Sequence, residues 1–219
     1  MAGIKQTAVT LSSFLEGTVS TDPQTIAEHS EDTSIFHIEP ALVIFPKNVN
    51  DLKKLVLFAA DPAHDITLTA RSAGTDMSGG PLTDSVVLNF TKHFDRIISV
   101  NEKCAITQPG VYYRDFEKET LKYGSLLASY TASKELNTVG GMVANNSAGE
   151  KSLTYGKTAR WVRSMKVVLH DGNEYEFRKL NRTELEEKKA LNTFEGQLYR
   201  DVDWIIHEHE HTLQEEKPT

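Results

Sequence analysis

Glycine is concentrated in two short stretches of this 219-residue sequence. Seven of the 13 glycines lie within residues 71–80 and 140–156. Glycine adopts positive φ at little steric cost and lets a backbone approach a ligand closely. Two such stretches predict two loops that meet at a bulky ligand. The alternative, a pair of tight surface turns that bind nothing, stays open at this point.

The first stretch, Arg71 to Gly80, directly follows a short apolar run that is typical of a strand. Successive backbone N–H groups in such a loop can form a concave site for an anion such as a pyrophosphate. Thr75 and Ser78 add hydroxyl groups, and Arg71 adds a positive charge at the start of the loop. The stretch therefore predicts a phosphate-binding loop.

Two common nucleotide motifs are incomplete. Residues 74–79 have the glycine spacing of a P-loop, but Gly80 and Pro81 stand where Lys and Ser or Thr should follow. The pair Lys157-Thr158 has that second half, but Lys151 occupies the position of the first glycine. A P-loop needs both halves, because its lysine must reach the phosphates that the loop holds. The sequence contains no Gly-x-Gly-x-x-Gly, so a Rossmann dinucleotide site is unsupported as well.

Four separated motifs occur in a characteristic order. Residues 71–80 are followed by Gln108-Pro-Gly-Val111, then by Thr138-Val-Gly-Gly-Met-Val-Ala-Asn-Asn-Ser-Ala-Gly149, and then by Ser152-Leu-Thr-Tyr-Gly156 with Trp161-Val162. This series closely resembles the FAD-binding domain of the vanillyl-alcohol-oxidase/PCMH superfamily, and most closely its D-lactate dehydrogenase and glycolate oxidase branch.

The resemblance runs from about residue 33 to the C-terminus and implies FAD as the cofactor. It matches the first loop to the FAD pyrophosphate and ribityl chain, a second turn to the adenosine side, and the later loops to the pyrophosphate, the isoalloxazine and the adenine. The implied FAD-binding residues are Arg71, Ser72, Ala73, Gly74, Thr75, Asp76, Ser78, Gly79, Pro109, Gly110, Val111, Thr138, Gly140, Gly141, Asn145, Ser147, Gly149, Gly156 and Val162.

The sequence departs from the family pattern at several of these positions. Thr75 replaces the histidine through which some relatives attach FAD covalently, so we expect non-covalent binding. Asp76 places a carboxylate near the expected pyrophosphate, where like charges repel, and we expect it to point away and cap a following helix. Thr131 and Asn137 stand where close relatives often have Pro and Cys, which leaves the conformation of the flavin-side loop open.

The first half of the sequence predicts a small parallel α/β lobe over about residues 22–95. The apolar runs 41–45, 66–70 and 85–90 are typical of buried strands, and the first two flank a helical stripe from Leu52 to Ala59, with Asn48 or Asn50 as its N-cap. Strand, helix and strand at this spacing indicate a parallel pair with a right-handed crossover. We expect the first forty residues to be mostly irregular, with a short helix near residues 25–30.

The second half, about residues 96–219, predicts a larger antiparallel sheet flanked by helices. Residues 97–101 and 105–108 resemble a hairpin, and so do 164–170 and 174–177, which flank the turn Asp171-Gly172. Helices are expected over 113–123, ended by Gly124, and after Thr183, where residues 183–186 have the capping-box pattern. The expected fold class is therefore α+β, of the PCMH type that the resemblance implies.

Three other features have ordinary structural interpretations. His207 and His211 satisfy a zinc-protease pattern and would share a helical face, but no third ligand follows, so a solvated helix is favoured and no metal is expected. Cys104 lies in a strand pattern without a partner base, which indicates a buried structural thiol. We expect Trp161 and Trp204 to pack in cores.

Composition narrows the class of protein. With 39% hydrophobic and 25% charged residues the sequence is typical of a globular protein, and its net charge of −7 argues against nucleic acid or an anionic membrane as partner. No apolar run is long enough to span a bilayer, and no signal peptide is evident. A single cysteine fits a reducing compartment, so we expect a cytoplasmic protein, with peripheral membrane association of the full-length enzyme left open.

The resemblance implies a flavin-dependent enzyme that oxidises a 2-hydroxy acid by hydride transfer to flavin N5. In such enzymes a substrate domain follows, which we expect to lie outside this chain, and no catalytic residue is assigned within these residues. The chain alone is therefore expected to be inactive. Two alternatives remain: a separate flavin-carrying electron-transfer subunit that completes its site with a partner, and a non-catalytic nucleotide-binding module.

Overall fold

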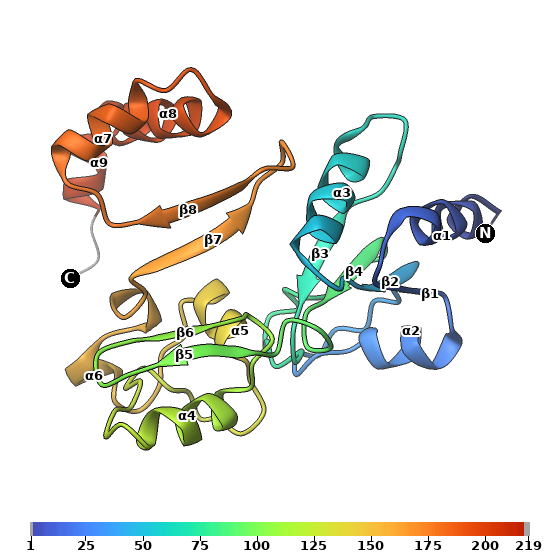
Figure 1. Ribbon diagram of the computed structural model, residues 1–219, viewed down its shortest axis with the longest axis horizontal. Coiled ribbons are helices and arrows are strands. Elements are labelled where there is room, and N and C mark those ends of the chain that lie inside the picture. Colours follow the sequence, from blue (N-terminus) through green and yellow to red (C-terminus); the bar gives the residue numbers. More distant parts are fainter. Residues whose placement is uncertain (1, 217–219) are drawn as a thin grey trace. The chain divides into compact units, whose positions relative to one another are not determined.

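A computed structural model describes residues 2–216 of the chain. They divide after Val162 into two compact units, residues 1–162 and 163–219 (Figure 1). The mixture of helices with parallel and antiparallel strands confirms the α+β class. The expected lobe boundary near residue 95 falls inside the first unit and stays a prediction. No helix within the described residues is both long enough and apolar enough to cross a membrane.

The first unit begins with a four-stranded sheet in the order β1-β2-β4-β3. Its strands are β1 (Thr18–Ser20), β2 (Leu42–Phe45), β3 (Leu68–Arg71) and β4 (Val86–Asn89), and only β1 runs antiparallel to its neighbour. The parallel arrangement is confirmed, but β2 and β3 are not the neighbours that the sequence suggested. All four residues of β4 are buried, whereas β3 includes the exposed Ala70. The more apolar strand therefore takes the central position.

Three helices accompany this sheet: α1 (Ala2–Phe14), α2 (Pro23–His29) and α3 (Val49–Ala60). The prediction of an irregular lead-in is wrong. Ile4, Ala8, Leu11 and Leu15 recur at helical spacing and pack in the same core as β2 and α3, which stabilises α1 through tertiary contacts.

The N-cap of α3 is one of the two residues that the sequence offered. The Asn48 side chain accepts a hydrogen bond from the Asp51 backbone N–H at 3.1 Å, which selects Asn48 over Asn50 as the α3 cap. Pro23 occupies the first turn of α2, as expected for a residue that lacks an N–H.

A fully buried carboxylate joins α1 to α3. Asp51 accepts hydrogen bonds from the backbone N–H groups of Glu16, Gly17 and Lys47, at 3.0, 2.9 and 2.9 Å. A charged group is tolerated in a core when hydrogen bonds satisfy its oxygens, and here three backbone donors do so. The side chain thus fixes the turn between α1 and β1 against the start of α3.

The remainder of the first unit contains a hairpin and short helices. Strands β5 (Ile97–Val100) and β6 (Ala105–Thr107) pair antiparallel as predicted. They are followed by α4 (Tyr113–Leu121), α5 (Val139–Ala144), α6 (Ser152–Tyr155) and a 3₁₀ turn, η1 (Thr158–Arg160).

A second core lies in this part of the chain, formed by Val111, Tyr113, Phe116 and Met142. Burial raises the pKa of the Tyr113 phenol well above its ordinary value, and its O–H donates to the Leu127 carbonyl at 3.0 Å. This core fixes the start of α4 against α5, and so places the turn that precedes α4 beside the second glycine stretch.

The second unit is a hairpin, β7 (Ser164–Val168) with β8 (Glu174–Arg178), followed by α7 (Arg182–Lys189), α8 (Phe194–Glu208) and α9 (Glu210–Glu215). The hairpin around Asp171-Gly172 is confirmed, but the strands β5 to β8 form two separate hairpins instead of one larger antiparallel sheet.

Several local expectations for side chains and caps are wrong. The capping box is made by Asn181 and Glu184, three residues apart, and not by residues 183–186. His207 lies in α8 and His211 in α9, so a helix break at residue 209 removes the shared helical face. Trp161 and Trp204 are 42% and 62% exposed, and Cys104 is only partly buried. Residue type alone did not determine burial at these positions.

Candidate functional site

A hydrogen bond between two hydroxyl groups joins the two glycine stretches. Thr138 Oγ1 donates to Ser72 Oγ at 2.6 Å, although 66 residues separate them. Thr138 is also the N-cap of α5, since the Gly141 backbone N–H donates to its hydroxyl at 3.2 Å. A Cβ on Gly141 would lie 3.1 Å from Ser72 Oγ, so glycine leaves room for the first loop at this position. The predicted meeting of the two loops therefore occurs in the structure.

The turn at residues 109–111 joins the same assembly. The Gly140 N–H donates to the Pro109 carbonyl at 2.8 Å, and the Val139 N–H donates to the Val111 carbonyl at 2.9 Å. A Cβ on Gly140 would lie 2.4 Å from Pro109 Cβ, which only glycine avoids. Three of the four sequence motifs thus form one continuous set of contacts.

Gly110 anchors this turn to the strand sheet of the first unit. Its N–H donates to the Phe94 carbonyl at 2.7 Å, and a Cβ there would lie 2.1 Å from the Phe90 carbonyl oxygen. Phe90 directly follows β4, so the turn is fixed relative to the end of the central strand.

The loop that follows α5 folds back on itself. The Ser147 carbonyl accepts from the Thr158 N–H at 3.0 Å and from the Thr158 hydroxyl at 2.8 Å. A Cβ on Gly149 would lie 1.8 Å from the Tyr130 carbonyl oxygen, and Gly156 has a φ of 81°. The other predicted residues here are Asn145, which is the exposed C-cap of α5, and Val162, which is half-buried.

Arg71 does not present its charge at the open side of the first loop. Its guanidinium is buried and donates to the carbonyl oxygens of His29 and Glu31, at 3.3 and 2.6 Å. Burial lowers the pKa of Arg71 from its ordinary value, and the nearby Asp32 opposes this effect. The side chain therefore supports the loop from beneath, where a Cβ on Gly74 would lie 2.3 Å from its Nη2 atom.

The expectation that Asp76 caps a following helix is wrong, because its carboxylate closes a turn within the loop. Its Oδ2 accepts from the Ser78 hydroxyl at 2.8 Å and from the Gly80 N–H at 2.7 Å. These hydrogen bonds, with that from Ser78 the strongest influence, hold the pKa of Asp76 below its ordinary value. The carboxylate already accepts hydrogen bonds from donors of its own turn, which reduces the repulsion expected for a nearby phosphate.

The remaining residues of the first loop are partly accessible. Ala73, Thr75 and Gly79 are half-buried, while Ser78 is exposed, although its hydroxyl is used by Asp76. Gly79 has a φ of 82°, so the backbone enters the left-handed region at two of the three glycines of the loop, Gly74 and Gly79. The loop geometry is thus the one that glycine was expected to provide.

A buried hydrogen-bond acceptor without a partner lies beside Thr138. Asn137 is only 5% exposed, and its Oδ1 atom has no hydrogen-bond partner among the described residues. Its amide nitrogen donates to Thr131 Oγ1 at 2.7 Å, so the two departures from the family pattern are bonded to each other. FAD carries hydroxyl and N–H donors along its length, and a buried acceptor of this kind is costly unless it is matched. The residues present therefore fit FAD.

The chain shares its fold with two solved structures, an oxidase and a synthase. It superposes on 4-ethylphenol oxidase from Gulosibacter chungangensis with a TM-score of 0.68 and 25% identity, over 80% of this chain and 35% of the other. An alkyldihydroxyacetonephosphate synthase gives a TM-score of 0.69 at 20% identity, over 83% of this chain and 37% of the synthase.

The sequence defines the family. Residues 40–178 match the model of the FAD binding domain, and the chain belongs to this family, so the resemblance to the PCMH type is confirmed. D-2-hydroxyglutarate dehydrogenase of Pseudomonas putida is 28% identical over 86% of this chain, and the glycolate oxidase subunit GlcD of Bacillus subtilis is 30% identical over 61% of it. The matches span only 19% and 29% of those relatives.

Sequence reasoning missed the residues that hold the first loop from outside. Thr33 donates through both its N–H and its hydroxyl to the Asp76 carbonyl, at 3.1 and 2.7 Å, and the ring of Phe36 lies against Gly79. Arg71 bonds to carbonyl oxygens of the same segment. Backbone carbonyls leave no mark in residue type, so no sequence pattern could have identified these contacts.

Proposed function

We propose that this chain binds FAD non-covalently in the assembly formed by residues 71–80, 109–111 and 138–162, and that it is the flavin-carrying part of a dehydrogenase for a 2-hydroxy acid. The observation that carries the proposal is the bond between Ser72 and Thr138, which unites the two glycine loops. Thr75, in place of a linkable histidine, supports non-covalent binding.

The FAD-binding residues that we assign are those named from the sequence, with Arg71 contributing through the position of the loop. Backbone N–H groups of the first loop bind the phosphates of the cofactor, and Asp76 keeps its charge while its Oδ2 atom accepts hydrogen bonds from donors of its own turn. The Asn137 oxygen accepts from a donor of the bound cofactor.

The substrate class rests on the names of the relatives. D-2-hydroxyglutarate dehydrogenase and glycolate oxidase act on 2-hydroxy acids, and their sequences match the same part of this chain. Bound FAD supplies an acceptor for a hydride equivalent. Oxidation of a hydroxy acid also needs a cation for the carboxylate and a base near the α-carbon. We place both outside residues 71–162, in another part of the protein or in a partner subunit.

We further assign the protein to the cytoplasm, because a single cysteine is typical of a reducing compartment.

Titration of the chain with FAD, followed by quenching of flavin fluorescence, tests the binding proposal. We expect saturable binding, and Ser72→Ala should weaken it about fivefold, because one hydrogen bond between the loops contributes about 1 kcal/mol. Ser99→Ala, on the exposed face of β5, is the matched control and should leave the affinity unchanged. Absence of saturable binding by the folded wild-type chain would refute the proposal.

A further inference from the structure

The first glycine loop contacts a segment of the chain that precedes the residues matched by the family model. Residues 29–38, which we call the strap, lie N-terminal to the matched residues 40–178. The strap bonds to the loop through Thr33 and Asp76, and a Cβ on Gly79 would lie 2.9 Å from the Phe36 ring. The position of the loop therefore depends on what fixes the strap.

His29 fixes the start of the strap in its neutral form. It is the last residue of α2 and only 6% exposed. Its Nδ1 lies 2.8 Å from the Thr25 carbonyl, which can only accept, so Nδ1 carries the proton. Its Nε2 lies 2.8 Å from Asn89 Nδ2. The Asn89 oxygen already accepts from the N–H and the hydroxyl of Thr91, each at 2.8 Å, so the amide NH₂ must donate to Nε2.

The same contacts connect His29 to the loop. Asn89 is paired with Arg71 across β4 and β3. The Arg71 guanidinium in turn donates to the carbonyl oxygens of His29 and Glu31 and lies directly beneath Gly74. Imidazole, amide and guanidinium thus form one buried set of contacts under the start of the loop.

Protonation of His29 is incompatible with this arrangement. A proton on Nε2 would oppose the Asn89 NH₂, and reversing that amide would break both bonds to Thr91. A second buried positive charge would also lie beside Arg71. Burial, and to a smaller extent Arg71, lowers the pKa of His29 from its ordinary value of 6.5, against the hydrogen bond that His29 donates to the Thr25 carbonyl and the charge of Glu28.

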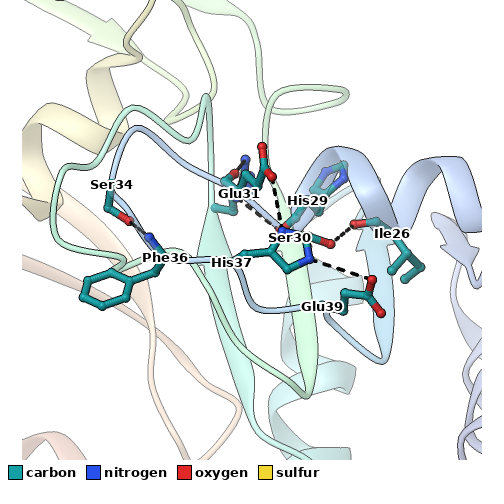
Figure 2. A network of polar contacts seen from close by, with 9 residues as sticks. Ile26, His29, Ser30, Glu31, Ser34, Phe36, His37 and Glu39 are labelled. Atoms are coloured by element: carbon teal, nitrogen blue, oxygen red, sulfur yellow. Dashed lines mark hydrogen bonds and ion pairs between the residues drawn. The ribbon is translucent and has the colours of Figure 1, made fainter.

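The other charged groups of the strap have neighbours that differ from those of His29. His37 lies between Glu31 and Glu39, with ring nitrogens 3.2 and 3.8 Å from their carboxylates, as Figure 2 shows. Carboxylates therefore face both ring nitrogens of this exposed side chain, unlike those of His29. Asp32, beside Arg71, carries the opposite charge. Of the two strap histidines, therefore, only His29 would release the strap when it is protonated.

We propose that neutral His29 is a positioning residue for the first glycine loop, and that its protonation releases the loop and weakens FAD binding. The part that concerns FAD rests on the proposed function. Because the folded chain binds this proton less readily than the unfolded chain does, the arrangement is fully stable above the ordinary pKa of histidine and loses stability as the pH falls below it.

The test compares the wild-type chain with His29→Gln, whose side-chain oxygen can accept from Asn89 but does not titrate. His37→Gln is the matched control from the same strap. FAD affinity of the wild type should fall by up to about tenfold between about pH 7.5 and about pH 5.5, since one unit below the ordinary pKa at least about a tenth of the imidazole stays neutral. The affinity of His29→Gln should remain flat, and that of His37→Gln should follow the wild type.

Hydrogen exchange without FAD separates this proposal from the proposed function. Amides of residues 33–38 and 71–80 should lose protection below about pH 6.5 in the wild type but not in His29→Gln. This pattern in a chain that does not bind FAD would refute the proposed function and support the positioning role. Equal loss of protection in both chains would overturn the positioning role.

Asn89→Asp provides a second variant should His29→Gln fail to fold. A carboxylate would accept from protonated Nε2, so the ring should titrate at higher pH by NMR, and loop protection should persist in acid. Loss of protection at the same pH as in the wild type would overturn the proposal.

Discussion

Replacement of Gly74 by alanine would have two effects: backbone strain at positive φ, and a clash of the new Cβ with Arg71. A second glycine of the chain allows the two effects to be measured separately. Gly74 and Gly124 both have positive φ, with nearly equal values of 68° and 66°. A Cβ on Gly74 would lie 2.3 Å from Arg71 Nη2, whereas a Cβ on Gly124 would meet nothing within 4 Å. Gly124→Ala is therefore a control for backbone strain alone.

The expected difference follows from the bonds that Arg71 would lose. Both variants should lose about 1–2 kcal/mol of stability, because alanine is strained at positive φ. In Gly74→Ala the guanidinium must also move away from the carbonyls of His29 and Glu31. A hydrogen bond made by a charged group contributes about 1.5–3 kcal/mol, so loss of both should cost this variant about 3–6 kcal/mol more than the control.

Urea denaturation followed by circular dichroism gives the two free energies of unfolding, and an FAD titration at a temperature where both variants are folded gives the affinities. We expect FAD affinity to fall more than about tenfold in Gly74→Ala, because the loop no longer rests on Arg71, and to stay unchanged in Gly124→Ala. Equal losses of stability in the two variants would show that Arg71 does not support the loop.

Three further outcomes are expected. Asp51→Ala should reduce the free energy of unfolding by about 3 kcal/mol in urea denaturation, since it leaves three backbone N–H groups unmatched, and a loss below about 1 kcal/mol would contradict the role of the buried carboxylate. Gly149→Ala should abolish saturable FAD binding, because its Cβ would lie 1.8 Å from the Tyr130 carbonyl oxygen, whereas Gly3→Ala, with nothing within 4 Å, should bind normally; unaltered binding by Gly149→Ala would remove this loop from the site. Acid precipitation should leave the flavin in the supernatant, because Thr75 offers no linkable ring, and flavin retained in the pellet would show a covalent bond.

The sequence predicted those elements whose signal is local. Apolar runs located β2 and β4, the Asp-Gly turn located the second hairpin, and Asn48 was one of the two caps considered for α3. Strand order was not predictable in this way, because periodicity says which face of a strand is buried and not which strand lies beside it. The stripe of α1 was present from Ile4 to Leu15, and it was missed because its stability comes from packing against distant strands.

The sequence predicted which loops form the candidate site, but it did not predict the contacts that hold those loops in place. Glycine clusters and hydroxyl residues marked the loops that the structure brings together. The direction of Arg71 was not predictable, since its partners are backbone carbonyls at residues 29 and 31 and any sequence could supply them. The partners of Asp76 were not predictable either, because the hydrogen-bond donors to its carboxylate lie within its own turn.

The glycines of this site are needed for contacts between the loops themselves, whether or not a ligand is bound. A Cβ on Gly110, Gly140 or Gly149 would meet the backbone of Phe90, Pro109 or Tyr130, within 2.1, 2.6 and 1.8 Å, so these residues permit loop-on-loop contact. A cradle assembled by such contacts is already ordered before binding, and binding then costs less conformational entropy than it would for free loops. It follows that substitutions at these glycines should weaken FAD binding by displacing loops, even where the new side chain never reaches the cofactor.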